Sequence, residues 1–201
     1  NLDMLPMPVA DMDFVVADEI LAAIDKITSH GILGYSIVPD SLKLLAQQKI
    51  ERDYSWSTSI DTQVWIPGIV PGITAACAAL TNENEGIITA VPVYHPFHLV
   101  AGWVNCPLIT FAMIKEGNRW TFDFADFERG LQKGPNVFLL CNPHNPGGTV
   151  FNEFEIKRIV DLCAAYNVTI VSDEIHADLR LHAQSKHISI GRFEKQPIIS
   201  F

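Results

Sequence analysis

The sequence predicts an α/β fold in which a mostly parallel sheet is covered by helices on both faces. Three continuous apolar runs, residues 86–91, 136–141 and 168–172, show no alternation of polar and apolar side chains. Such runs are typical of strands that are buried on both faces. The segments between these runs have the apolar spacing of amphipathic helices, and helices that connect buried strands are typical of a parallel sheet.

The first part of the chain is predicted to be mainly helical. Isoleucines share one face of a helix over residues 17–30, and Gly31 follows as its C-terminal cap. We then expect a second, weaker helix over 41–54, a short strand over 63–66, and a helix over 72–80 that follows a turn rich in proline and glycine.

The remaining part is predicted to alternate between strands and helices. Asn152 and Glu155 have the spacing of a capping box, so a helix is expected to begin there. The expected elements are, in order, strand 86–91, helix 96–104, strand 106–113, a short strand with Trp120 and Phe122, a helix with Phe124, Phe127 and Leu131 on one face, strand 136–141, the capped helix, strand 168–172 and strand 197–201.

Composition excludes several classes of protein. The 201 residues carry 14 Lys and Arg against 23 Asp and Glu, and this net charge of −9 makes nucleic acid an unsuitable main partner. A 48% hydrophobic content argues against disorder. No apolar run approaches the roughly 18 residues that span a bilayer, and the N-terminus has no signal-peptide core. We expect a cytoplasmic protein with reduced core thiols at Cys77, Cys106, Cys141 and Cys163.

Polar residues follow two of the apolar strands, at the edge where ligands gather in parallel sheets. Residues 142–148, Asn-Pro-His-Asn-Pro-Gly-Gly, form either a rigid turn or a loop that holds an amide toward a ligand. Asp173 follows the second strand, where a carboxylate is costly to desolvate unless it meets a cation. His176 either reaches the same ligand or is a structural histidine. No metal site is expected, because no second His or Cys stands at ligand spacing.

Two further segments supply complementary groups. Residues 67–72 form either a plain turn or an anion site, since they lead directly into a predicted helix. Tyr94 follows strand 86–91 and places an aromatic ring at the same edge, whereas His95 and His98 are expected to be surface residues. A carboxylate, an amide or imidazole, an aromatic ring and a phosphate cradle are together what pyridoxal 5′-phosphate (PLP) requires.

Five segments of the chain also resemble one family, in the same order. They are Val-Ala-Asp-Met-Asp-Phe (9–14), His-Gly-Ile-Leu-Gly-Tyr (30–35), Pro-Val-Tyr-His-Pro-Phe (92–97), Cys-Asn-Pro-His-Asn-Pro-Gly-Gly (141–148) and Ser-Asp-Glu-Ile-His-Ala-Asp (172–178). This pattern resembles the MalY/PatB-type cystathionine β-lyases, a branch of the class I/II aminotransferase superfamily with the PLP-dependent fold type I.

The resemblance implies roles for individual residues. Asp173 would pair with the pyridine nitrogen of PLP, Asn145 and His176 would lie beside its phenolic oxygen, and Tyr94 would stack on its ring. The remaining implied roles are phosphate binding by Val70, Pro71 and the backbone that follows, contact of Tyr35 with the phosphate of the neighbouring subunit in a homodimer, and a substrate entrance bordered by Asp11, Met12, Asp13 and Phe14.

The resemblance also bears on the extent of the chain. Residues 1–30 would be an N-terminal segment of the small domain and entrance, and residues 31–201 an incomplete PLP-binding large domain. The Schiff-base lysine of the family would come a few residues after Phe201, so the chain is expected to be truncated before it and inactive alone. Lys186 precedes the last predicted strand and is expected to be a loop residue.

The expected activity of the full-length protein is that of a PLP-dependent carbon–sulfur β-lyase. It would act on cystathionine or cysteine-type amino acids and give a thiol, pyruvate and ammonia. The first alternative is a PLP-dependent aminotransferase, because both activities need the same contacts to the cofactor. The second is a non-catalytic fragment or binding module that lacks the Schiff-base lysine.

Overall fold

The computed structural model describes residues 9, 12–179, 181, 185–193 and 198–201. The chain divides into two compact units, Asn1–Val38 and Pro39–Phe201. The division expected from the sequence, into an N-terminal segment of residues 1–30 and a large domain of residues 31–201, concerns function and stays a prediction. Within the first unit, helix α1 (Asp18–His30) confirms the predicted helix, and Gly31 ends it in the left-handed conformation with φ 73°. The apolar face of α1 has no buried residue.

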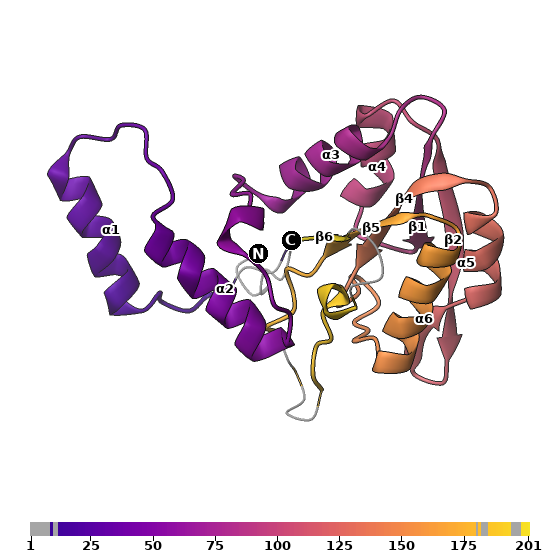
Figure 1. Cartoon of the computed structure of the whole chain (residues 1–201). Helices are drawn as coiled ribbons and strands as arrows, with labels where there is room; N and C mark the ends of the chain where they lie inside the picture. Colours follow the sequence, from indigo (N-terminus) through magenta and orange to yellow (C-terminus); the bar gives the residue numbers. More distant parts are fainter. Residues whose placement is uncertain (1–8, 10–11, 180, 182–184, 194–197) are drawn as a thin grey trace, which may run out of the picture. The chain divides into compact units, whose positions relative to one another are not determined.

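The second unit is built on a six-stranded sheet (Figure 1). Its strands lie in the order β3-β2-β1-β4-β5-β6. Among the described strands, only β2 and β3 pair in the antiparallel sense, so the predicted α/β class with a mostly parallel sheet is confirmed. The strands are β1 (Gly86–Val91), β2 (Leu108–Glu116), β3 (Arg119–Phe122), β4 (Pro135–Cys141), β5 (Thr169–Asp173) and β6 (Ile198–Ser200).

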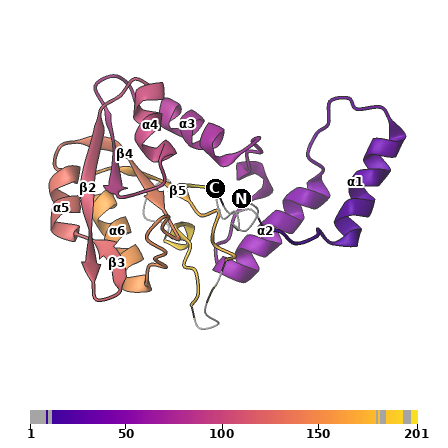
Figure 2. The ribbon, with the colours of Figure 1, turned by 180° about the vertical axis from the view of Figure 1, so that it is seen from behind.

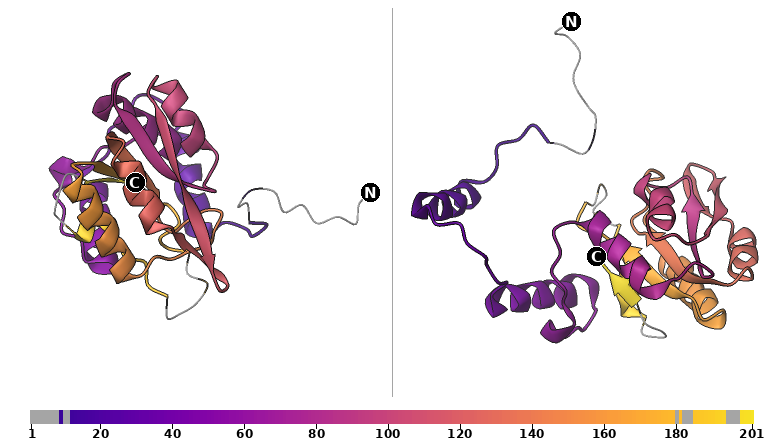
Figure 3. Two further views of the ribbon diagram at one scale, coloured as in Figure 1. Left: turned by 90° about the vertical axis from the view of Figure 1, so that its right-hand side faces the viewer. Right: turned by 90° about the horizontal axis from the view of Figure 1, so that it is seen from above.

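Helices cover both faces of this sheet (Figures 2 and 3). One core joins α3 and α4 to strand residues such as Ile87, and the other joins α5 and α6 to residues such as Ile88. Neighbouring strand residues face opposite sides, which explains why the buried strands are apolar throughout. The helices are α2 (Asp40–Tyr54), α3 (Ile69–Leu80), α4 (Pro96–Trp103), α5 (Phe124–Leu131) and α6 (Glu153–Ala165), with short 3-10 helices at Ile60–Thr62 and Ile190–Arg192.

Two sequence-based expectations about this unit were wrong. Residues 63–66 form no strand, because they pair with none of the strands that the structure describes and Val64 stays 83% exposed. Helix α3 begins at Ile69 rather than at residue 72. Gly68 supplies the helix start with φ 130°, and Pro71 is tolerated because its missing N–H would have no partner in the first turn.

Other boundaries differ by small shifts. Strand β2 runs three residues beyond its expected end at Met113, because Met113–Glu116 pairs with β3 in a hairpin. The capping box of α6 is present as predicted, with Asn152 and Glu155 each bonding the backbone of the other.

All four cysteines are free, three of them buried and Cys106 partly exposed. Among the described residues, no helix has the length and apolar character needed to cross a bilayer.

Candidate functional site

The candidate site lies at the edge of the sheet that the carboxyl ends of the parallel strands form, at the position where the strand order reverses. Strand β1 lies between β2 and β4, so the chain turns to one side after β1 and to the other after β4. Loops that diverge in this way leave room for a ligand at the strand ends. Tyr94 follows β1, residues 142–148 follow β4, and residues 174–178 follow β5.

Asp173 is the last residue of β5 and lies beside Cys141 in the register of β4. Its side chain accepts a 3.1 Å hydrogen bond from the amide of Ile175, and the residue is only 4% exposed. Burial raises the pKa of Asp173, because desolvation disfavours its charged form. Among the described residues, no Lys or Arg forms an ion pair with this carboxylate. A cationic group of a ligand would therefore stabilise it.

The loop after β4 is anchored to the same strand ends. The amide of Asn142 donates a 2.9 Å hydrogen bond to the carbonyl of Asp173, and the amide of Asn145 donates to Cys141 Sγ at 3.3 Å. The side-chain amide of Asn145 is half-buried and has no protein partner in the described part of the chain. The loop thus holds a polar side chain with free hydrogen-bonding capacity near Asp173.

His144 lies in the middle of this loop and is buried. Its Nδ1 accepts a 3.2 Å hydrogen bond from the amide of Gly147, whereas its Nε2 is buried without a partner among the described residues. Burial lowers the pKa of His144 to about 4, so the imidazole is neutral at physiological pH. His144 therefore contributes to the packing of the loop rather than a positive charge to the site.

The first turn of α3 lies at the same edge. A Cβ atom on Gly72 would approach the side chain of Ile66 and would lie 2.6 Å from Phe201 Cε1, so the helix start packs against the residue that follows β6. Phe201 in turn accepts a 3.1 Å hydrogen bond from the amide of Glu174. Val70 and Pro71 lie within this turn rather than before it. Pro71 has no N–H and the amide of Gly72 bonds the carbonyl of Gly68, so the available donors are those of Gly68, Ile69 and Val70.

Tyr94 and His176 complete the predicted set at this edge. Tyr94 is 36% exposed and contacts the rings of His95 and Phe97 edge-on, so one part of its ring stays open. His176 is half-buried in the turn that follows Asp173. His95 and His98 are exposed, as expected. No group of three or more His, Cys, Asp or Glu within the described ranges is arranged to hold a metal ion.

Other predicted site residues belong to the first unit. Tyr35 is 111% exposed there, and Met12, Asp13 and Phe14 are exposed as well. Asp11 lies outside the described residues. Lys186, in the second unit, is exposed in the irregular segment before β6, which confirms its prediction as a loop residue.

Sequence reasoning missed a buried pair next to Asp173. Glu174 Oε2 and His187 Nε2 lie 2.8 Å apart, with both side chains less than a tenth exposed. Nothing in their spacing of 13 residues indicates this contact. The one available signal was the placement of a second carboxylate, Glu174, directly after an apolar strand.

Comparison with known proteins gives consistent matches. Residues 8–197 match the family model described as aminotransferase class I and II. Cystathionine beta-lyase PatB of Bacillus subtilis is 33% identical over 187 residues, which are 92% of this chain and 48% of PatB. The chain spans about half the length of the curated relatives it matches.

Solved structures agree with this result. A PLP-bound putative aminotransferase from Clostridium difficile 630 has a TM-score of 0.90 and 35% identity, and the match covers 98% of this chain and 52% of that chain. The PLP-bound C–S lyase from Staphylococcus hominis has a TM-score of 0.88 and 26% identity, covering 96% of this chain and 50% of that chain. Both structures therefore have the same fold as this chain over the matched residues.

Proposed function

Because the chain belongs to the class I and II aminotransferase family, we propose that its site binds pyridoxal 5′-phosphate in a full-length carbon–sulfur β-lyase. The observation that carries the proposal is the buried carboxylate of Asp173, which has a raised pKa and forms no ion pair with Lys or Arg in the described ranges. A protonated pyridine nitrogen is the cation that such a carboxylate lacks.

The other residues of the site fit the same cofactor. Asn145 has a free side-chain amide for the phenolic oxygen, and His176 lies in the adjoining turn. The first-turn amides of α3, at Ile69 and Val70, suit the phosphate, because helix starts favour anions. The partly open ring of Tyr94 supports the proposal that it stacks on a flat ligand.

The chemistry divides between the cofactor and the chain. When bound, PLP supplies an electron sink for the electron pair that remains at Cα of an amino acid after deprotonation. Asp173 would keep a proton on the pyridine nitrogen, which would strengthen this sink. Asn145 would orient the ring by hydrogen bonding to its oxygen, and Tyr94 would limit the access of water to one face. We assign none of the described residues at this edge as the base that takes the Cα proton.

The lyase assignment is supported by relatives named cystathionine beta-lyase, including PatB at 33% identity. A PLP-dependent aminotransferase is the second candidate, since a structure of 35% identity is titled a putative aminotransferase. The test is to incubate the full-length, PLP-loaded protein with cystathionine and to measure pyruvate and free thiol. A lyase releases both without a 2-oxo acid, whereas an aminotransferase forms product only when a 2-oxo acid is present.

We propose in addition that the active protein is a cytoplasmic homodimer with shared sites. The exposed ring of Tyr35 supports a contact outside its own unit, and the four free thiols suit a reducing compartment. Met12, Asp13 and Phe14, with Asp11, are proposed to border the substrate entrance. If the 201-residue chain occurs alone, we propose that it acts as a non-catalytic binding module or fragment.

A further inference from the structure

One buried carboxylate, that of Glu174, joins three separate segments of the second unit. Its Oε2 faces His187 Nε2 at 2.8 Å, and the two side chains are 6% and 2% exposed. Its Oε1 accepts hydrogen bonds from the amide of Ile190 at 2.9 Å and from Ser172 Oγ at 3.1 Å. Buried carboxylates need such partners, because an unpaired charge in the interior is costly. The segment 187–190 is therefore fastened to the end of β5.

Asn142 connects this carboxylate to the loop that carries Asn145. The side chain of Asn142 donates to the carbonyl of Ile188 at 3.0 Å and, more weakly, to Glu174 Oε1 at 3.4 Å. The backbone of Asn142 also donates to the carbonyl of Asp173. The two loops that hold the proposed cofactor contacts are thus tied to each other through Glu174 and its neighbours.

A second layer of contacts holds His187 and the far end of the same turn. The ring of Tyr54 meets the imidazole of His187 edge-on, with centroids 5.3 Å apart. The hydroxyl of Tyr54 donates to Asp178 Oδ1 at 2.5 Å, and Lys49 forms an ion pair with the same oxygen at 2.9 Å. The turn from Asp173 to Asp178 is consequently fixed at both of its ends.

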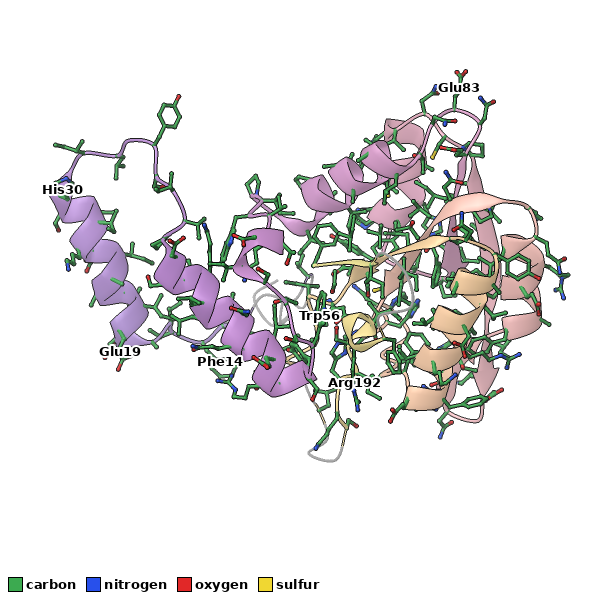
Figure 4. All side chains as sticks on the ribbon, in the orientation of Figure 1. Phe14, Glu19, His30, Trp56, Glu83 and Arg192 are labelled. Atoms are coloured by element: carbon green, nitrogen blue, oxygen red, sulfur yellow. The ribbon has the colours of Figure 1, made fainter. Side chains whose placement is uncertain are left out.

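The chain leading into β6 is packed from outside as well. Trp56 lies beside the 3-10 helix that ends at Arg192 (Figure 4), and a Cβ atom on Gly191 would collide with the Trp56 ring. Ile190 and His187, which bond Glu174, precede this contact in the same segment. The acceptor groups of Glu174 therefore meet donors whose own positions are constrained.

We propose that Glu174 and His187 are positioning residues, which hold Asp173 and the Asn145 loop at the spacing the cofactor requires. The inference rests on the proposed PLP site. Asp173 and Glu174 are consecutive, so a shift of the Glu174 carboxylate changes the direction in which β5 presents the Asp173 carboxylate. Groups that support ligand-contacting residues from behind set how precisely those residues are held.

The test uses the full-length protein and compares two buried carboxylates. Glu174→Gln replaces the carboxylate that faces His187 with a neutral amide. His187→Phe keeps an aromatic ring at this position but removes the hydrogen bond to Glu174. His187→Gln restores a donor and serves as the conservative variant. Glu155→Gln is the matched control, because Glu155 is also buried and paired with Arg119, at 2.6 Å, but has no bond to either site loop.

Three quantities are measured: the Kd for PLP by absorbance titration, the visible circular dichroism of the bound cofactor, and the thermal midpoint of the cofactor-free protein. We expect Glu174→Gln and His187→Phe to raise the Kd roughly 10-fold and to change the visible dichroism. The Kd of His187→Gln should stay within about 3-fold of wild type. Glu155→Gln should lower the midpoint while its Kd stays within about 2-fold.

Two results would overturn the positioning role. In one, the Kd and dichroism of His187→Phe equal those of wild type. In the other, Glu155→Gln weakens PLP binding as much as Glu174→Gln, which would indicate a general loss of stability. The His187 variants decide the question even if Glu174→Gln does not fold. If wild-type protein binds no PLP, the proposed function itself fails, and this outcome is distinct from both.

Discussion

The backbone amide of Asn142 donates a 2.9 Å hydrogen bond to the backbone carbonyl of Asp173, across the ends of β4 and β5. The register that places Cys141 beside Asp173 continues through this bond into the two loops. The loop amide and the buried carboxylate are therefore fixed relative to each other by the sheet. This bond ties the loop that carries Asn145 to the strand end that carries Asp173, so the two proposed ligand-contacting residues are held at one edge although they are far apart in sequence.

Asp173→Asn should have opposite effects on cofactor binding and on stability. The folded protein raises the pKa of Asp173. The contribution of this residue to the free energy of unfolding therefore falls as pH rises above the pKa that the residue has in the unfolded chain. The PLP-free variant should accordingly unfold at a higher denaturant concentration than wild type near pH 7.5. Its affinity for PLP should decrease, because the pyridine nitrogen loses its anionic partner. Equal PLP affinity in variant and wild type would contradict the assignment.

His144 should make the protein sensitive to mild acid. Its pKa is about 4 when folded and 6.5 when unperturbed, so the unfolded chain binds a proton first as pH falls below about 6.5. Between pH 7 and pH 4, wild type should lose about 3 kcal/mol more unfolding free energy than His144→Gln. Denaturant titrations at several pH values measure this difference. Parallel losses in the two proteins would show that His144 is not the titrating group.

Gly72→Ala should disturb the first turn of α3. The new Cβ atom would meet Ile66 and Phe201, and overpacking of this kind costs about 1–3 kcal/mol. PLP affinity should fall as well, since the turn carries the proposed phosphate donors. Gly102→Ala in α4 is the control, because a Cβ atom there meets nothing within 4 Å. Stability unchanged in Gly72→Ala would argue against the close packing of this turn.

Lys186→Ala should leave the visible absorbance of the bound cofactor unchanged. Lys186 is exposed in the irregular segment before β6. The spectrum of the full-length variant after PLP loading provides the comparison with wild type. Loss of the visible band would mean that Lys186 is the lysine that bonds the cofactor.

Mixing two defective variants should restore activity if the sites are shared. Tyr35→Phe should weaken PLP binding by about 1.5–3 kcal/mol, the range for a hydrogen bond to a charged group. A heterodimer of Tyr35→Phe and Asp173→Asn subunits would contain one site with both native residues. Activity should therefore recover after the variants are unfolded and refolded together. No recovery, or a monomer in light scattering, would contradict the shared site.

Much of the second unit could be predicted from sequence because its signals are local and periodic. The apolar runs of β1 and β4 and the capping box at Asn152 each depend on neighbouring residues. Residues 63–66 do not form the predicted strand, because a strand also needs a hydrogen-bonding neighbour, which a short apolar run does not reveal. Helix α3 begins earlier than its predicted start because Pro71 fits within the first turn of the helix.

The site residues that lie at or just after the ends of predicted strands could be found from the sequence. Asp173 and Asn145 could be found because parallel strands bring their carboxyl ends to one edge. The Glu174–His187 pair could not, since it joins a strand end to an irregular segment through tertiary packing alone. The role of Tyr35 stays a prediction, because its exposed ring meets no partner within the first unit as described.

The most direct test of the account is the protonation state of the pyridine nitrogen of bound PLP. Full-length protein is loaded with PLP that carries 15N at this position, and its NMR chemical shift is measured near pH 8 for wild type and Asp173→Asn. We predict a protonated nitrogen in wild type and an unprotonated one in the variant, because the buried carboxylate of Asp173 stabilises the proton. An unprotonated nitrogen in wild type would contradict the pairing of Asp173 with the cofactor.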